Sequence, residues 1–178
     1  MAEKLVINNY TDILCVWAWI AQRRTEELES VWGEKIDLQH QYVNVFGDAH
    51  TRIEGQWAGR GGFAGFGTHV VDSAALSEEI RRAFFVDARD VGQLPVLYEI
   101  AIGASIDSET IRSRVRDGSA TAALMKDYQQ AASQGISGSP SWVMNDGRQK
   151  LYGNIGYHVL NANVEGLLSQ HGDEASWC

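Results

Sequence analysis

Asp12-Ile13-Leu14-Cys15-Val16-Trp17-Ala18-Trp19 joins an apolar, strand-like segment to a helical one and places Cys15 at the junction. At the N-terminus of a helix, free N–H groups and the helix dipole favour a thiolate over a thiol. A second cysteine three residues later would pair with Cys15, but that position is Ala18. The pattern predicts a reactive thiol without a neighbour to resolve its disulfides. The alternative is that Cys15 is a small, buried apolar residue.

The composition limits the number of domains and the classes of partner. The 178 residues are 44% hydrophobic, which is enough for one compact domain or one domain with a large insertion. A net charge of −8 without a long basic run argues against nucleic acid and anionic membranes as partners. The chain shows no secretory cleavage pattern and no apolar run long enough to span a bilayer. Its two cysteines, Cys15 and Cys178, stand far apart, so we expect the reducing cytoplasm.

The first part of the chain predicts a parallel strand–helix–strand unit. Residues 5–9 read as a buried strand, residues 16–32 as a helix ended by Gly33, and alternating residues from Ile36 to Val45 as a second strand. One face of the helix is expected to be buried, and its positions are Trp17, Ile20, Ala21, Arg24, Leu28 and Val31.

The middle of the chain is predicted to be helical after a glycine-rich loop at residues 59–67. This loop lacks the lysine and the spacing of a phosphate-binding loop, so a lid or a plain connection is the better interpretation. Helices are expected at 73–85, at 92–103 with Pro95 in the first turn, from Ser108, and from a capping Ser119 to Gln134. Two strands joined by a turn at Asp146-Gly147 and a final helix with Leu160, Val164, Leu167 and Leu168 should follow.

This order of elements, with a thiol at the first helix and Gly138-Ser139-Pro140 before the third strand, resembles the DsbA family of thioredoxin-fold proteins. The nearest likeness is to the branch of FrnE and 2-hydroxychromene-2-carboxylate isomerase. Residues 10–19, 82–90 and 135–157 carry the resemblance. It implies an α/β thioredoxin-like fold, with a thioredoxin-like domain made of residues 1–65 and 135–178 and an all-helical insertion at 66–134.

The resemblance also implies a binding edge beside the thiol. In this family the proline that matches Pro140 is cis, and the backbone of the preceding residue, Ser139, then faces the thiol. Its N–H and C=O can pair with an extended peptide or glutathione as an added strand. Cys15 is thus the implied catalytic residue, with Ser139, Pro140, Trp17 and Asn154 as implied binding residues. The alternative for Pro140 is an ordinary trans turn proline.

The chain departs from the family's patterns at two places. Ala18 stands where the disulfide exchangers have their second cysteine. The isomerase and kappa-class glutathione transferase relatives carry an Asp-Arg pair after the third strand, whereas this chain has Tyr152-Gly153-Asn154-Ile155-Gly156. The isomerases also use serine at the position of Cys15. Neither branch is matched in full.

Other residues near the expected site have weaker signals. Asp12 is predicted to be a surface helix cap, with proton acceptance as the alternative, and His69 is a candidate supporting residue because it follows the glycine-rich loop. One of Trp17 and Trp19 is expected in the core, and the other could line the thiol pocket. The terminal Cys178 is expected to be inert, with a role as a distant resolving thiol as the alternative.

The remaining histidines and the arginine doublets are predicted to have structural roles. The five histidines have no metal-ligand spacing, so no metal site is predicted. His40 alternates within a strand and is expected to be a satisfied sheet residue. The doublets Arg23-Arg24 and Arg81-Arg82 are expected on solvated helix faces. The histidines are His40, His50, His69, His158 and His171.

These observations together predict a DsbA-like thiol–disulfide oxidoreductase that acts through Cys15 alone. Glutathione or another external thiol would resolve the adduct, and no tightly bound cofactor is expected. The expected partner is a small thiol or a protein disulfide, and a homodimer is left open. One alternative is a glutathione-dependent isomerase or transferase, and another is a non-catalytic module that binds peptides near Ser139.

Overall fold

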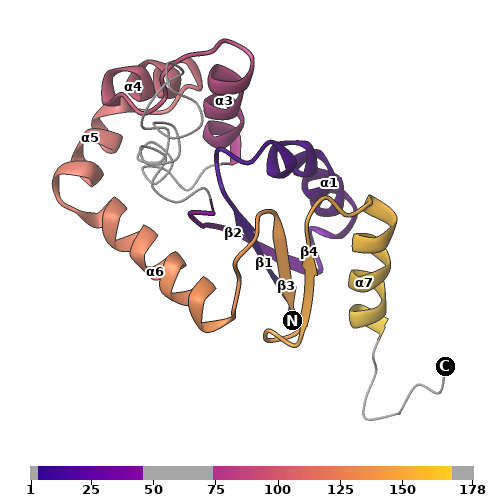
Figure 1. Ribbon diagram of the computed structural model, residues 1–178. Helices are drawn as coiled ribbons and strands as arrows, with labels where there is room; N and C mark the ends of the chain where they lie inside the picture. The colour runs from indigo at the N-terminus through magenta and orange to yellow at the C-terminus, as the bar shows by residue number, and fades with distance from the viewer. Residues whose placement is uncertain (1–3, 46–73, 170–178) are drawn as a thin grey trace.

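A four-stranded sheet with the order β2-β1-β3-β4 forms the centre of the computed structural model, which describes residues 4–45 and 74–169 (Figure 1). β1 is parallel to β2 and antiparallel to β3, and β3 is antiparallel to β4. The predicted strand–helix–strand unit and the later hairpin are therefore confirmed. The strands are β1 (Leu5–Thr11), β2 (Ile36–Tyr42), β3 (Ser141–Met144) and β4 (Gln149–Tyr152).

The helices lie close to their predicted positions. They are α1 (Val16–Trp32), α3 (Ala74–Phe85), α4 (Leu94–Gly103), α5 (Ser108–Arg116), α6 (Ser119–Ser133) and α7 (Tyr157–Ser169). The prediction that Ser119 caps α6 is wrong. Gly118, with φ of 80°, is the N-cap, and the N–H of Ser119 donates instead to the carboxylate of Asp117 at 2.8 Å.

Each face of the sheet has its own core because neighbouring residues of a strand point to opposite sides. Ile7 packs with Leu28 of α1 and Leu160 of α7 on one face. Tyr10 packs with Ala131 of α6 on the other face. Figure 1 accordingly shows α1 and α7 on one side of the sheet and α6 on the other.

The helices α3 to α5 build a third core beside the sheet, at the upper left of Figure 1. Ile13 and Tyr42, which follow β1 and end β2, pack into this core with Leu76 and Ile80 of α3. The helices between β2 and β3 are thus anchored to the ends of β1 and of the edge strand β2. The predicted domain boundary at residues 65 and 66 lies outside the described residues, so the exact division stays a prediction.

The face of α1 that is buried differs from the predicted one. Trp17, Ile20 and Val31 are 53%, 44% and 57% exposed, so the prediction that they form the buried face is wrong. The buried residues of α1 are Ala18, Ala21, Gln22, Thr25 and Leu28. Hydrophobicity alone misplaced this face because the polar Gln22 is buried against Arg81 of α3 and Thr25 is buried with its hydroxyl bonded to the Ala21 carbonyl.

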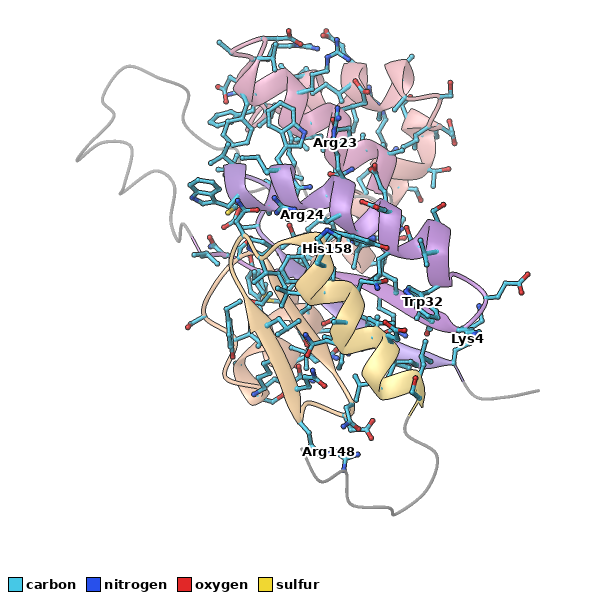
Figure 2. All side chains as sticks on the ribbon, turned by 90° about the vertical axis from the view of Figure 1, so that its right-hand side faces the viewer. Lys4, Arg23, Arg24, Trp32, Arg148 and His158 are labelled. Carbon is cyan, nitrogen blue, oxygen red and sulfur yellow. The ribbon has the colours of Figure 1, made fainter. Side chains whose placement is uncertain are left out.

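Two polar pairs lie on the outer side of α1, and Figure 2 labels the α1 member of each, Trp32 and Arg24. The indole Nε1 of Trp32 donates to Asn161 Oδ1 of α7 at 2.8 Å. The guanidinium of Arg24 donates to the side chain of Asn154, in the connection between β4 and α7. In Figure 2, Arg24 lies on the side of α1 toward α7 and Arg23 on the side toward the helices α3 to α5. The first pair joins α1 to α7, and the second joins α1 to the connection before α7.

Candidate active site

Cys15 is the N-cap residue of α1 and is only 3% exposed. Its N–H donates to the carbonyl oxygen of Asp12 at 3.1 Å, and its own carbonyl accepts from the N–H of Trp19 at 3.1 Å. The turn from β1 into α1 thus fixes the backbone of Cys15. Its thiol Sγ donates to the carbonyl oxygen of Ser139 at 3.2 Å. The structure therefore brings together the predicted nucleophile and the predicted binding loop.

The loop before β3 is fastened to the turn before α1. The Ser139–Pro140 peptide bond is cis, and Pro140 is fully buried. Ser139 Oγ accepts from the N–H of Asp12 at 2.7 Å, and the carbonyl of Pro140 accepts from the N–H of Gly153 at 2.8 Å. The Ser139 carbonyl was expected to be open for a substrate strand. In this structure it is instead the acceptor of the Cys15 thiol.

Ala18 lies one helical turn after Cys15 and is 4% exposed. It therefore occupies a buried position beside the thiol where a second sulfur would have to stand. Cys15 is the single cysteine within the described residues, and it is not in a disulfide. Cys178 lies outside the described residues, so the structure does not bear on its role.

Asp12 is buried at 5% exposure, so the prediction that it is a surface helix cap is wrong. Its Oδ1 accepts from the N–H of Leu14 at 2.9 Å, and its Oδ2 accepts from the N–H of Val45 at 2.8 Å. A carboxylate that accepts two backbone N–H groups fixes the chain around it. Asp12 thus ties the turn before Cys15 to the segment that follows β2.

Arg81 of α3 is a residue of this site that the sequence analysis missed. It is 3% exposed, so the prediction that the Arg81-Arg82 doublet lies on a solvated face is wrong for its first member. Its Nη1 donates to Gln22 Oε1 at 2.7 Å, and its Nη2 donates to Thr11 Oγ1 at 2.6 Å. The doublet gave no signal of burial, because the partners of Arg81 come from α1 and from the end of β1.

The electrostatic surroundings of Arg81 include the candidate nucleophile. Burial lowers the pKa of the Arg81 guanidinium, and nearby negative charges oppose this effect. The groups whose ionised forms oppose it are, in decreasing order of effect, Tyr42, Glu78, Cys15 and Asp12. A buried guanidinium thus lies within electrostatic reach of the Cys15 sulfur.

A small polar cavity lies where α1, the sheet and α3 meet. Its volume is about 20 Å³, which is room for about one water molecule. It extends from Ala18 and Pro140, beside the thiol, to Arg81. We refer to it as the polar cavity, and its lining residues are Asn9, Thr11, Ala18, Ala21, Gln22, Thr25, His40, Tyr42, Ser77, Arg81 and Pro140.

Neither tryptophan of the first helical turns belongs to the core clusters. Trp17, an implied binding residue, is exposed two positions after Cys15. The ring of Trp19 stacks on Phe85 with centroids 5.5 Å apart, and its Nε1 donates to Glu78 Oε2 at 2.8 Å. Trp19 thus joins α1 to α3, and the prediction of one core tryptophan is wrong.

Other predicted residues lie further from the thiol or outside the described chain. Asn154 is exposed and pairs with Arg24, as described above. His40 lies in β2 and lines the polar cavity. His69 and the glycine-rich loop at residues 59–67 lie outside the described residues.

Residues 4–45 and 74–169 contain neither a candidate metal site nor a membrane-spanning helix. In this part of the chain, no group of three or more histidine, cysteine, aspartate or glutamate side chains could hold a metal ion. None of the helices in the same ranges is long and apolar enough to cross a membrane.

Residues 65–165, more than half of the chain, match the model of the family described as DSBA-like thioredoxin domain. No curated protein sequence matches the chain significantly.

Several solved structures share the fold. A putative protein disulfide isomerase from Nitrosomonas europaea has 22% identity and a TM-score of 0.75, over 96% of this chain and 100% of that one. A probable DsbA oxidoreductase from Streptomyces coelicolor has 19% identity and a TM-score of 0.76, over 97% and 94%. A 2-hydroxychromene-2-carboxylate isomerase has 12% identity and a TM-score of 0.66, over 93% and 97%. At these identities the likeness establishes the fold alone.

Proposed function

Because the chain belongs to the DSBA-like thioredoxin domain family, we propose that it catalyses thiol–disulfide exchange with Cys15 as its single nucleophile. One arrangement carries the proposal. The Cys15 sulfur stands at the N-cap of α1, 3.2 Å from the Ser139 carbonyl, and Ala18 fills the position of a resolving cysteine. A thiol in that place can attack a disulfide, but without a second cysteine it cannot be released from the mixed disulfide that it forms.

An external thiol then has to complete the reaction, and we propose glutathione or a similar small thiol. The Cys15 thiolate attacks the glutathione sulfur of a mixed disulfide between glutathione and a substrate thiol. A bond forms between Cys15 and glutathione, and the substrate leaves as a thiolate that takes a proton from water. A second glutathione thiolate attacks the bound glutathione sulfur, which releases the Cys15 thiolate and oxidised glutathione.

Ser139 has a different part in each protonation state of Cys15. The neutral thiol donates to the Ser139 carbonyl, so this carbonyl is occupied when the thiol carries its proton. A thiolate has no proton to donate, and the carbonyl is then free to accept from an N–H of an extended peptide or of glutathione. Pro140 borders this edge, and the exposed Trp17 and Asn154 are candidates for contacts with the rest of the ligand.

The reducing cytoplasm is the compartment that fits such a reaction, because glutathione is kept reduced there. A cytosolic disulfide reductase from Pseudomonas aeruginosa has the same fold, with 19% identity and a TM-score of 0.60 over 92% of this chain and 98% of that one.

The test follows reduction of a glutathionylated peptide by glutathione, with wild type, Cys15→Ser and Cys178→Ser compared. We expect Cys15→Ser to remove the enzyme-dependent rate and Cys178→Ser to retain it. Equal loss in both variants would make Cys178 a resolving thiol and overturn the single-nucleophile reaction. Binding of glutathione without turnover would favour a non-catalytic module, and turnover of an organic substrate with glutathione alone would favour an isomerase.

A further inference from the structure

Arg81 is the one arginine among the buried charged residues of the described chain, and its contacts lead to Cys15. Three of its hydrogen bonds go to Gln22, to Thr11 and, at 3.5 Å, to the carbonyl oxygen of Asp12. Its Nε, which is also buried, has no hydrogen-bond partner among the described residues. Burying a guanidinium is costly unless its charge is compensated. All three of these acceptors are neutral, so the compensating negative charge comes from groups that Arg81 does not contact in these bonds.

The Asp12 carbonyl connects Arg81 with the nucleophile. This oxygen accepts from the N–H of Cys15 at 3.1 Å and from Nη2 of Arg81 at 3.5 Å. The guanidinium therefore lies against the same peptide group that begins the turn into α1. Arg81 and Pro140 also line the same polar cavity. The positive charge is thus held on the inner side of the site, away from solvent that would screen it.

The electrostatic interaction between the two residues acts in both directions. A negative sulfur on Cys15 favours the charged form of Arg81, so a charged Arg81 favours a negative sulfur on Cys15 by the same free energy. Arginine stays protonated over the working range of a protein. Its charge is therefore constant while Cys15 titrates.

Other ionisable groups face Arg81 and Cys15 from the packed elements. Asp12 precedes Cys15, and Glu78 lies on α3. Tyr42 and His40 come from β2 and line the polar cavity. Asp127 of α6 accepts from the N–H of Tyr42 at 3.0 Å. Two carboxylates, those of Asp12 and Glu78, thus act on the site, and Arg81 is the buried positive charge among the described residues.

We propose that Arg81 is a positioning residue that stabilises the Cys15 thiolate. Its buried positive charge lies against the Asp12 carbonyl, which also accepts from the N–H of Cys15. This inference rests on the proposed function, because it assigns the charge that keeps the single nucleophile reactive. Arg81 thereby favours attack on a disulfide. It also favours the later release of Cys15 as a thiolate when an external thiol attacks the adduct, since a stabilised thiolate leaves more readily.

The test measures the rate of Cys15 alkylation by iodoacetamide as a function of pH, in a Cys178→Ser background. Arg81→Gln removes the charge, and Arg82→Gln is the matched control because Arg82 is the exposed neighbour on the same helix. We expect the midpoint of the Arg81→Gln curve to rise by about one pH unit relative to wild type. The rate would then fall about tenfold at any pH well below the midpoint. The rate on the alkaline plateau should stay the same, because there all of the thiol is ionised in both proteins.

Two more variants separate charge from structure. Arg81→Lys keeps a positive charge but lacks the planar guanidinium and its paired donors. The midpoint of its alkylation curve should therefore lie at least halfway back from that of Arg81→Gln to that of wild type. Should Arg81→Gln fail to fold, Arg81→Met takes its place, since methionine fills the space without a buried amide to satisfy. A folded Arg81→Gln or Arg81→Met protein with the wild-type midpoint would overturn the inference, and so would a lysine variant that behaves like the glutamine one.

Failure of this inference is distinguishable from failure of the proposed function. An unchanged alkylation midpoint, with exchange activity that still depends on Cys15, refutes the role of Arg81 alone. If the alkylation midpoint rises in Arg81→Gln but the exchange activity does not depend on Cys15, the electrostatic effect of Arg81 on the Cys15 sulfur is supported. The proposed reaction is then refuted.

Discussion

The sulfur of Cys15 lies 3.2 Å from the carbonyl oxygen of Ser139, a residue 124 positions away in the chain. The two meet because β1 and β3 are adjacent antiparallel strands, with Tyr10 opposite Ser141. The C-terminal end of β1 and the N-terminal end of β3 therefore lie side by side at the same end of the sheet. A second bond, from the N–H of Asp12 to Ser139 Oγ at 2.7 Å, fastens the two loops beside the sulfur.

We expect Ala18→Cys to form a disulfide with Cys15 and to give the protein dithiol behaviour. Ala18 is buried one turn after Cys15, a spacing that suits disulfide geometry. In a Cys178→Ser background, mild oxidation should consume both thiols, as measured by thiol titration and by mass. Ala21→Cys is the control, because Ala21 is also buried but lies about 9 Å along the helix from Cys15. Two free thiols in oxidised Ala18→Cys would contradict the placement of Ala18.

Ser139→Ala should destabilise the protein, because it removes the acceptor of a buried N–H. The N–H of Asp12 would lose its partner, at a cost of about 1–3 kcal/mol in the free energy of unfolding. Urea denaturation measures the change. Ser137→Ala, at an exposed position of the same loop, should change the free energy by less than about 0.5 kcal/mol. Equal effects in the two variants would show that the bond between the two loops contributes little.

Gln22→Leu tests whether the guanidinium of Arg81 depends on its polar partners. The variant leaves Nη1 of Arg81 without the acceptor that now lies at 2.7 Å. Loss of a bond to a buried charged group should lower the free energy of unfolding by about 1.5–3 kcal/mol. The same substitution at the exposed Gln39 of β2 serves as the control, with an expected change within about 0.5 kcal/mol. A Gln22→Leu protein as stable as wild type would place the guanidinium elsewhere.

Stability should fall at alkaline pH because tyrosines are buried. Burial, with a smaller effect of the Asp127 charge, raises the pKa of Tyr10 from 10.0 to about 12, and a hydrogen bond with Gln130 opposes this. The pKa of Tyr128 is also raised to about 12, mainly by burial. Above pH 10 the unfolded chain ionises these groups while the folded protein keeps them neutral. Their contribution is thus complete below pH 10 and is lost as the pH rises toward 12, by at most about 1.4 kcal/mol per pH unit for the buried Tyr10 and by less for the partly exposed Tyr128, where solvent screens the charge.

Tyr10→Phe should remove one of the two contributions to this alkaline slope. The free energy of unfolding, measured by urea denaturation from about pH 9 to 12, should fall less steeply in the variant than in wild type. The variant also lacks the hydrogen bond from the Tyr10 hydroxyl to Gln134, so its stability at neutral pH should be lower. Identical slopes in the two proteins would indicate that Tyr10 ionises normally in the folded state.

Much of the fold follows from patterns that are local in the chain. Period-two and helical spacing located the strands and helices, and the Asp146-Gly147 pair marked the turn of the β3–β4 hairpin. Cys15 at a helix start and the Ser139-Pro140 pair before β3 were recognisable because each is a short motif with its own backbone geometry. The errors were local as well. Ser119 was assigned as a cap by residue type, although the left-handed Gly118 occupies that position.

The sequence by itself determined the order of elements, the reactive cysteine at a helix start and the missing second cysteine at Ala18. The tertiary structure decided which polar side chains are buried. Asp12 and Arg81 read as surface residues because the contacts that accompany their burial come largely from residues distant in sequence. Their partners, Val45 for Asp12 and Gln22 and Thr11 for Arg81, come from other elements of the fold. Burial of a charge depends on such distant partners, and periodicity along one helix does not contain them.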